Sequence, residues 1–174
     1  MKIRKRPKWA IGTAAVASGW LALTVPVQAD IVTDWSAVAS DVVRQVSAPG
    51  GANPGSISES ERPPAYGFDM ATFHLALYDT IVAFKGGYDS FAAAPDKVKK
   101  RASMEAAANE AAYTVLNTLF PNKSATYLPV YNTKMAALVA QGVSAQSIED
   151  GRAAGLDVAT QVLALRAADG RLTP

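Results

Sequence analysis

The sequence contains no cysteine and only one histidine, His74. The absence of cysteine excludes disulfide bonds, thiolate catalysis, iron–sulfur clusters and cysteine-ligated zinc. A single histidine cannot supply a histidine-rich metal site. The chain must therefore be stabilised by packing of its core alone, and its 174 residues are enough for one such domain.

Long apolar runs are also absent after the N-terminus. Residues 1–29 are typical of a secretory signal peptide, with a basic start (MKIRKRPK), an apolar run (WAIGTAAVASGWLALTV) and a cleavage site after Ala29. An uncleaved anchor is the less favoured alternative, because a run of about 17 residues is at the short limit for crossing a bilayer. We therefore expect an exported, periplasmic or secreted protein without a membrane segment after cleavage.

The basic character of the chain comes from this N-terminal segment. Residues 1–29 hold five of the 17 basic residues and no acidic ones, so the remainder has 12 basic and 15 acidic residues and a net charge of −3. Surfaces that bind nucleic acid are usually basic. The sequence therefore predicts no nucleic-acid partner.

Helical periodicity dominates residues 30–174, and no convincing strand pattern is present. The expected helices span residues 30–48, 65–85, 96–120, 124–141 and 144–168. Proline and glycine separate them, and Asp96 and Ser144 are candidate N-caps. The sequence thus predicts a single all-α domain, an orthogonal or irregular bundle of about five helices. The long segment 49–64 is expected to be mobile or functional.

Apolar rows predict which helix faces pack inside. The helix at 65–85 carries two such rows and is expected at the centre of the bundle. The first row is Tyr66, Met70, Phe73, Leu77, Ile81 and Phe84, and the second is Ala71, Leu75, Tyr78 and Val82. In the later helices, Leu128 and Leu165 are expected to face inward, and Pro129 predicts a kink or a helix start at Leu128. Gly151 and Gly155 predict a closely packed neighbour.

His74 is the residue around which a catalytic site would form. It lies one helical turn from Tyr78, and the favoured interpretation is a buried or half-buried histidine that donates to a backbone carbonyl or to Tyr78. A general acid–base role and a ligand role are the alternatives. A Ser-His-Asp arrangement is formally possible, but the sequence has no G-x-S-x-G elbow and no glycine-rich phosphate loop of known spacing.

The remaining charged residues are expected to lie on solvent-exposed surfaces. Glu105 with Glu110, and Glu149 with Asp150, are interpreted as solvent-exposed helix faces. The basic run KVKKR at 97–101 is placed in the first turn of its helix, where it opposes the helix dipole. It is interpreted as a solvated segment in preference to an anion site. The sequence therefore predicts no catalytic, cofactor-binding or metal-binding residue in this chain.

Four segments follow one another in a characteristic order: VTDWSAVASDVVRQV, MATFHLALYDTIVAFKGGYDSF, an alanine-rich helix ending in LNTLFP, and GLDVATQVLALRAADGR. They contain the patterns D-W-x-x-x-A, H-x-x-x-Y-D, Y-x-x-(F/Y) and L-R-A-x-D-G. This ordered set resembles the N-terminal helical region of bacterial vanadium-dependent haloperoxidases, which belong to the type 2 phosphatidic acid phosphatase (PAP2) superfamily. The resemblance covers essentially all of residues 30–174.

The resemblance implies peroxidase or phosphatase chemistry for the whole family protein. Vanadate or phosphate is held there by a lysine, two arginines, a P-S-G-H segment and a histidine from S-R-x-x-x-G-x-H. The sequence contains neither segment, and His74 matches a family histidine that is not a vanadate residue, so no active-site residue is carried over.

We therefore expect half of an enzyme, a truncated, split or partial product that is inactive alone. The full-length family would use vanadate, but this chain is expected to bind no cofactor. Its partners would be a C-terminal catalytic half or a second copy bound through an exposed apolar face. The alternative is a stand-alone exported helical scaffold or binding module, and a small hydrolase that uses His74 ranks third.

Overall fold

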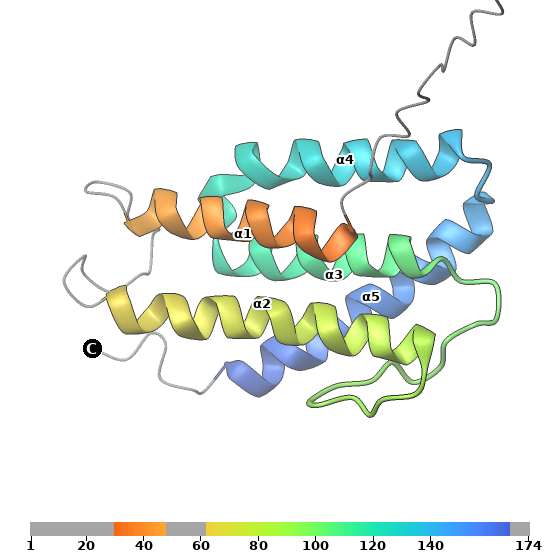
Figure 1. Cartoon of the computed structure of the whole chain (residues 1–174), viewed down its shortest axis with the longest axis horizontal. Coiled ribbons are helices and arrows are strands. Elements are labelled where there is room, and N and C mark those ends of the chain that lie inside the picture. Colours follow the sequence, from red (N-terminus) through yellow and green to blue (C-terminus); the bar gives the residue numbers. More distant parts are fainter. Residues whose placement is uncertain (1–29, 48–61, 168–174) are drawn as a thin grey trace, which may run out of the picture.

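The computed structural model describes residues 30–47 and 62–167. Within these residues the chain forms five α-helices and one short 3-10 turn, and no strand (Figure 1). The helices are α1 (Ile31–Ser47), α2 (Arg62–Lys85), α3 (Met104–Leu119), α4 (Ser124–Ala140) and α5 (Ala145–Arg166), and the turn is η2 (Pro121–Lys123). The predicted all-α fold is confirmed.

Two sequence predictions fall on other parts of the chain. The predicted signal peptide, residues 1–29, and most of the segment 49–64 lie outside the described residues. The last residues of that segment are helical, because α2 begins at Arg62. Among the helices described, none is both long enough and apolar enough to cross a membrane.

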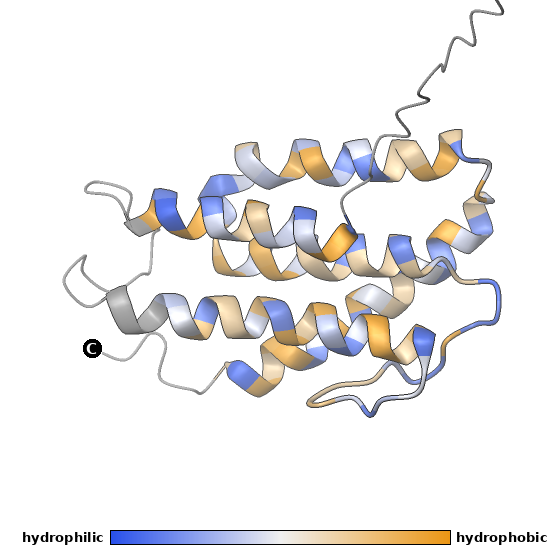
Figure 2. Cartoon of the chain, viewed as in Figure 1, coloured by the Kyte–Doolittle hydropathy of each residue, from blue (hydrophilic) through white to orange (hydrophobic). Residues whose placement is uncertain are grey.

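Helix α3 lies at the centre of the bundle and contacts each of the other four helices. In Figure 1, α1 and α2 run in front of it, α4 runs above it, and α5 crosses obliquely behind. Seven consecutive residues of α3, from Ala106 to Ala112, are buried. Such burial on all sides suits a helix rich in alanine, because its small side chains let neighbouring helices approach closely. Apolar residues accordingly cover most of the length of α3 (Figure 2).

Helix α5 packs directly onto the backbone of α3. A Cβ atom added at Gly151 would lie 2.3 Å from the carbonyl oxygen of Ser103, and one added at Gly155 would lie 2.1 Å from that of Ala107. No side chain fits into either space. The prediction that a neighbour packs closely against these glycines is confirmed, and that neighbour is the main chain of α3.

The prediction that α2 occupies the centre is wrong. Its first apolar row packs inward, with Phe73 and Leu77 each 1% exposed. In its second row, Ala71 and Tyr78 are exposed to solvent. One face of α2 meets α3, α5 and α1, and the segment that follows α2 lies beside part of the opposite face. Periodicity identified both rows, but it could not show which of them would find a partner.

Several helix boundaries also differ from the prediction. Helix α3 starts at Met104 instead of near Asp96, because Ser103 is the N-cap and its hydroxyl accepts a hydrogen bond from the Ala106 N–H. The basic run at 97–101 would oppose a helix dipole at that position. Helix α4 starts at Ser124 and contains Pro129 in its interior. The predicted Ser144 cap of α5 is confirmed.

Two leucines that were expected inside are at the surface. Leu128 of α4 is 38% exposed and Leu165 of α5 is 62% exposed. Both lie on helices that cover only one side of the bundle. In α1, by contrast, the apolar side chains of Trp35, Val42 and Val46 are all inaccessible to solvent.

The contact between α3 and α5 is tested by the substitution Gly155→Ala. We expect it to lower the free energy of unfolding by about 1–3 kcal/mol, because the new methyl group overpacks a backbone contact. Gly67→Ala is the matched control, since Gly67 is helical and has open space around its Cα. The control should be stabilising by about 0.5–1 kcal/mol. Urea unfolding measures both, and equal stability of the two variants would contradict the close contact.

Candidate functional site

His74 lies on the outer face of α2 and is exposed to solvent. Its ring packs edge-on against Phe73, with ring centroids 5.2 Å apart. Within the described residues it makes no hydrogen bond to Tyr78 or to a backbone carbonyl. The Tyr78 hydroxyl instead donates to the backbone carbonyl of Asp89 at 3.4 Å. The prediction of a buried or half-buried, hydrogen-bonded histidine is therefore wrong.

An open depression of ≈ 560 Å³ lies beside His74, between α2 and the segment that follows it. Asp89 and Ser90 also line this depression. A serine, a histidine and an aspartate thus share one surface, but no hydrogen bond joins them in the part of the chain that the structure describes. A nucleophile requires contact with its base, and the base with an orienting acid. This geometry does not provide that chain of contacts.

Asp79 is completely buried and binds the segment after α2. Its Oδ1 accepts from the backbone N–H of Phe91 at 2.6 Å, and its Oδ2 accepts from those of Ala92 and Ala93 at 2.9 and 2.8 Å. One carboxylate therefore fixes three successive peptide groups. Sequence analysis did not assign this role to Asp79. The sequence did contain one indication of this role. Asp79 follows Ala76 by three residues, so both lie on the inward face of α2.

Asn109 forms a second buried polar contact, between three helices. Its Oδ1 accepts from the indole Nε1 of Trp35 in α1 at 2.9 Å, and its Nδ2 donates to the carbonyl of Tyr131 in α4 at 3.1 Å. Asn109 is inaccessible to solvent, so these partners satisfy an amide that would otherwise be costly to bury. The tryptophan of the D-W-x-x-x-A pattern thus ties α1 to α3.

Glu110 joins α3 to α4 and α5. The Tyr131 hydroxyl donates to its Oε2 at 2.6 Å, and the Arg152 Nε donates to the same oxygen at 2.8 Å. Arg152 also reaches Glu149 through its Nη1 at 3.0 Å. Glu110 is buried, so the prediction that it lies on a solvated face is wrong, whereas Glu149 is exposed as expected.

This cluster alters the protonation of its members. Burial, together with the hydrogen bond to the Glu110 carboxylate, raises the pKa of Tyr131 to about 12. The hydrogen bond to Glu110 also raises the pKa of Arg152 above its usual range. The cluster is therefore an arginine paired with carboxylates and a neutral tyrosine, and the proton of the tyrosine is held more tightly than in water.

Asp150 is another buried carboxylate, with a side chain that is 2% exposed. It accepts from Lys99 Nζ and Gln146 Nε2, each at 2.7 Å, and from Arg101 Nε at 3.3 Å. The hydrogen bond from Lys99 holds the pKa of Asp150 below its usual range. The prediction of a solvated Asp150 is wrong, because the basic run at 97–101 precedes α3 and binds the start of α5.

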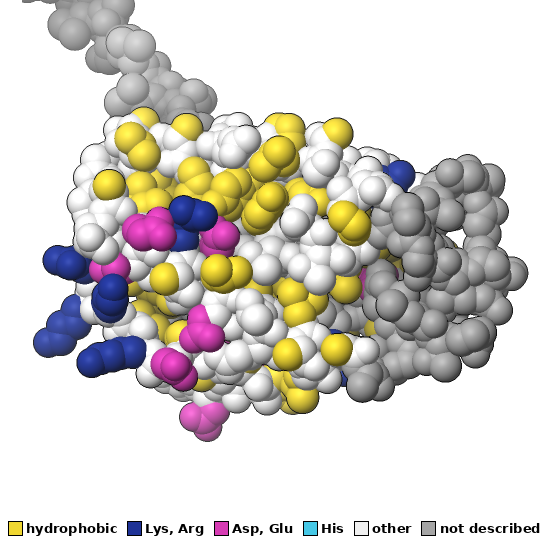
Figure 3. Space-filling model, turned by 180° about the vertical axis from the view of Figure 1, so that it is seen from behind, with side chains coloured by type: hydrophobic (Ala, Val, Ile, Leu, Met, Phe, Trp, Pro, Cys, Tyr) yellow, Lys and Arg dark blue, Asp and Glu magenta, His cyan; other side chains and the backbone are white. Residues whose placement is uncertain are grey.

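The basic run at 97–101 also gives one end of the molecule a positive charge. Figure 3 shows lysine and arginine side chains gathered at the end where the segment between α2 and α3 lies. Lys97 and Lys100 are exposed there beside the two residues that hold Asp150. Lys97 and Lys100 are thus the solvated part of the run, whereas Lys99 and Arg101 are its structural part.

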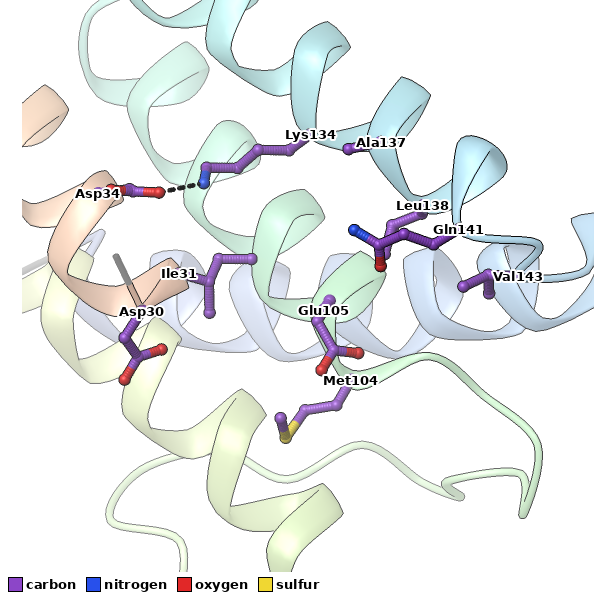
Figure 4. Close-up of a pocket in the computed structure, with 10 residues that line it drawn as sticks. All are labelled: Asp30, Ile31, Asp34, Met104, Glu105, Lys134, Ala137, Leu138, Gln141 and Val143. Atoms are coloured by element: carbon purple, nitrogen blue, oxygen red, sulfur yellow. Dashed lines mark hydrogen bonds and ion pairs between the residues drawn. The ribbon is translucent and has the colours of Figure 1, made fainter. Parts of the chain in front are cut away.

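A cleft of ≈ 510 Å³ lies where α1, α3 and α4 meet. Figure 4 shows Lys134 pointing toward Asp34, and their Nζ and Oδ2 atoms are 2.5 Å apart. Asp30 and Glu105 also line the cleft. The lysine offsets one of these three carboxylates, so the cleft has an acidic lining. Among the described residues, no group of three or more histidine, aspartate or glutamate side chains is placed to hold a metal ion.

Comparisons of the chain with models of protein families, with curated proteins and with solved structures find no match. The geometry of the chain itself must therefore carry the functional argument. Three of the four buried carboxylates in the described part of the chain, Asp79, Glu110 and Asp150, each bind donors that belong to a neighbouring helix or segment. Residue types that could serve catalysis are used here to join elements of the fold.

The role of Asp79 is tested by the substitution Asp79→Asn. An asparagine would place an amino group against backbone N–H donors, so we expect the free energy of unfolding to fall by about 2–3 kcal/mol. Hydrogen exchange should also become faster at the amides of residues 91–93. Asp89→Asn, on the exposed part of the same segment, is the control and should stay within about 0.5 kcal/mol of wild type. Similar losses in both variants would argue against the proposed contact.

The Asp150 ion pairs predict a pH dependence of stability. Because the pKa of Asp150 is lowered in the folded state, its contribution is fully present above about pH 4, the usual range of an aspartate, and is lost as the pH falls through the lowered pKa. Asp150→Asn should thus be less stable than wild type at pH 7, and the difference should shrink in strong acid. Lys99→Gln should have a smaller effect at pH 7, because Arg101 and Gln146 remain. A difference that does not change with pH, measured by urea unfolding, would refute this account.

Proposed function

We propose that this chain is the N-terminal helical portion of a protein of the vanadium-dependent haloperoxidase and PAP2-like phosphatase group, and that it supplies packing surface instead of catalytic groups. The ordered sequence patterns support the family assignment. The observation that carries the non-catalytic role is the use of Asp79, Glu110 and Asp150 in contacts between parts of the fold. Each of these carboxylates accepts at least two hydrogen bonds from donors of the chain itself.

The cationic groups support the same proposal. A tetrahedral oxyanion such as vanadate or phosphate requires several convergent cationic donors. In this fold Lys99 and Arg101 converge on Asp150, and Arg152 converges on Glu110 and Glu149. These cations are thus directed at carboxylates of the protein. An anion would have to displace an internal ion pair to use them.

The outer side of α4 is the surface that we assign to a catalytic partner region. Leu128 and Val139 are 38% and 65% exposed, and their spacing of about three helical turns places them on one face. Figure 3 shows hydrophobic side chains over the upper part of the molecule, where α4 runs. Exposed apolar patches mark interaction sites. We propose that a C-terminal helical half packs on this side, and that residues 1–29 direct export to the periplasm or the medium.

The non-catalytic role is tested by incubating the purified chain with vanadate, hydrogen peroxide and bromide. We expect bromination of phenol red no faster than with free vanadate, because the cations that converge in this fold, Lys99 with Arg101 and Arg152, already bind carboxylates. Hydrolysis of p-nitrophenyl phosphate should likewise stay at the level of buffer. Bromination or hydrolysis above these backgrounds, proportional to the concentration of the chain, would contradict the proposal.

The family assignment has an independent test in the gene. A reading frame that continues beyond codon 174 and encodes P-S-G-H and S-R-x-x-x-G-x-H supports the assignment. The absence of these segments from the neighbouring sequence would favour a stand-alone exported scaffold or binding module.

A further inference from the structure

The open depression beside His74 combines aromatic rings with one carboxylate. It lies between α2 and the segment that follows this helix, which in Figure 1 turns back beneath the C-terminal part of α2. Two of its lining side chains, Tyr78 and Phe91, are 44% and 81% exposed. We refer to it as the His74 depression, and the residues that matter here are His74, Leu75, Tyr78, Asp89, Ser90 and Phe91.

The charge of the His74 depression favours a cation. Asp89 is exposed and makes no ion pair within the described residues, unlike the buried carboxylates that join the helices. No lysine or arginine lines the depression in the part of the chain that the structure describes. Lys85, the next basic residue along α2, is exposed at the end of the helix and is not part of the lining. A cation that enters therefore meets one negative charge.

The aromatic rings add a second attraction for a cation. The face of an aromatic ring is negative, and quaternary ammonium ligands are recognised mainly through such faces. The chain makes one contact of this kind itself, because the Arg166 guanidinium lies 5.8 Å from the ring centroid of Phe68. No other lysine or arginine of the described residues lies over an aromatic ring. The rings of Tyr78 and Phe91 thus remain accessible to an external cation.

Hydrogen bonds hold both walls of the depression in place. The Phe91 N–H donates to Oδ1 of the buried Asp79 at 2.6 Å. On the other wall, the Tyr78 hydroxyl donates to the backbone carbonyl of Asp89 at 3.4 Å. Tyr78 and Phe91 are therefore presented on an anchored backbone, and such preorganisation lowers the entropic cost of binding.

We propose that the His74 depression binds a methylated ammonium group, which belongs to a small molecule or to a lipid headgroup. Tyr78 and Phe91 contact its methyl groups, and the Asp89 carboxylate offsets its charge. The volume of ≈ 560 Å³ is within the range of small-molecule sites, roughly 300–1,000 Å³.

Other cations fit the His74 depression less well. A primary ammonium is strongly hydrated, and a single carboxylate replaces little of that hydration. A calcium or magnesium ion requires six or more oxygen ligands in total, and Asp89 is the only carboxylate in the lining that the structure describes. A methylated ammonium donates no hydrogen bond, so aromatic surface and one negative charge satisfy it.

The openness of the site sets the expected affinity. Cation–π contacts and ion pairs are both weak where solvent has access. We therefore expect a dissociation constant in the millimolar range, on the order of 1–10 mM for choline alone. This inference is independent of the proposed function, because it uses neither the outer side of α4 nor the family resemblance.

The test is a titration of the chain with choline, followed by the NMR chemical shifts of its backbone amides at about pH 8, where an ordinary histidine is neutral. Saturable shifts should gather at residues 88–92 and 74–78. Dimethylbutanol, in which carbon replaces the nitrogen of choline, has the same shape without the charge and should bind at least about fivefold more weakly. Absence of saturation at choline concentrations about tenfold above the expected dissociation constant would overturn the proposal. Equal binding of dimethylbutanol would also overturn it.

Two variants, each with a matched control, test the assigned side chains. Phe91→Ala and Asp89→Asn should each weaken choline binding about two- to fivefold. Tyr88→Ala and Asp96→Asn alter exposed residues of the same segment that do not line the depression, and they should bind as wild type does. Circular dichroism should show native helicity for all four variants, because these positions are exposed. Wild-type affinity in both Phe91→Ala and Asp89→Asn would contradict the proposal.

Sedimentation with phosphatidylcholine vesicles distinguishes the two sources of the ammonium group. Sedimentation of wild type that is weakened in Phe91→Ala would assign the site to a lipid headgroup. Choline binding without sedimentation would assign it to a free small molecule. Either result supports the ammonium site, whereas sedimentation that is equal in wild type and Phe91→Ala, without binding of choline, would place the lipid contact elsewhere and overturn it.

Discussion

The backbone contact between α3 and α5 is the constraint on which the rest of the fold depends. Gly151 and Gly155 let the carbonyls of α3 come within a distance that excludes any side chain. The Ser103 N–H donates to the Ser147 carbonyl at 2.9 Å, which fixes the relative register of the two helices. This register brings Asp150 to the basic run at 97–101 and brings Arg152 to Glu110. The polar contacts of the bundle are thus consequences of a packing arrangement that small residues permit.

Buried polar groups then connect the outer elements to this pair. Asn109 ties α1 and α4 to α3, and Asp79 holds the segment between α2 and α3 through three backbone N–H groups. Unpaired polar groups are costly to bury, and these are paired by donors from more than one element. They consequently specify how the helices are placed. These buried polar residues thus hold the helices and the segment after α2 in place.

The helices were predictable from the sequence, but the contacts between them were not. Periodicity and the Ser144 cap depend on neighbours within a few residues, which a sequence displays directly. Glu110 and Arg152 are 42 positions apart, and only the tertiary arrangement shows that Glu110 is buried. The two apolar rows of α2 are equivalent as patterns, so the sequence could not show that Tyr78 and its neighbours remain at the surface. The same ambiguity led to the incorrect prediction of a buried His74.

The central claim is that the buried carboxylates of this chain serve its fold by joining separate helices. A double-mutant cycle between Glu110 and Arg152, measured by urea unfolding, tests this claim most directly, because it isolates the energy of one such contact between α3 and α5. The account predicts that Glu110→Gln and Arg152→Gln are coupled by about 0.5–3 kcal/mol. Effects of the two substitutions that simply add would contradict it.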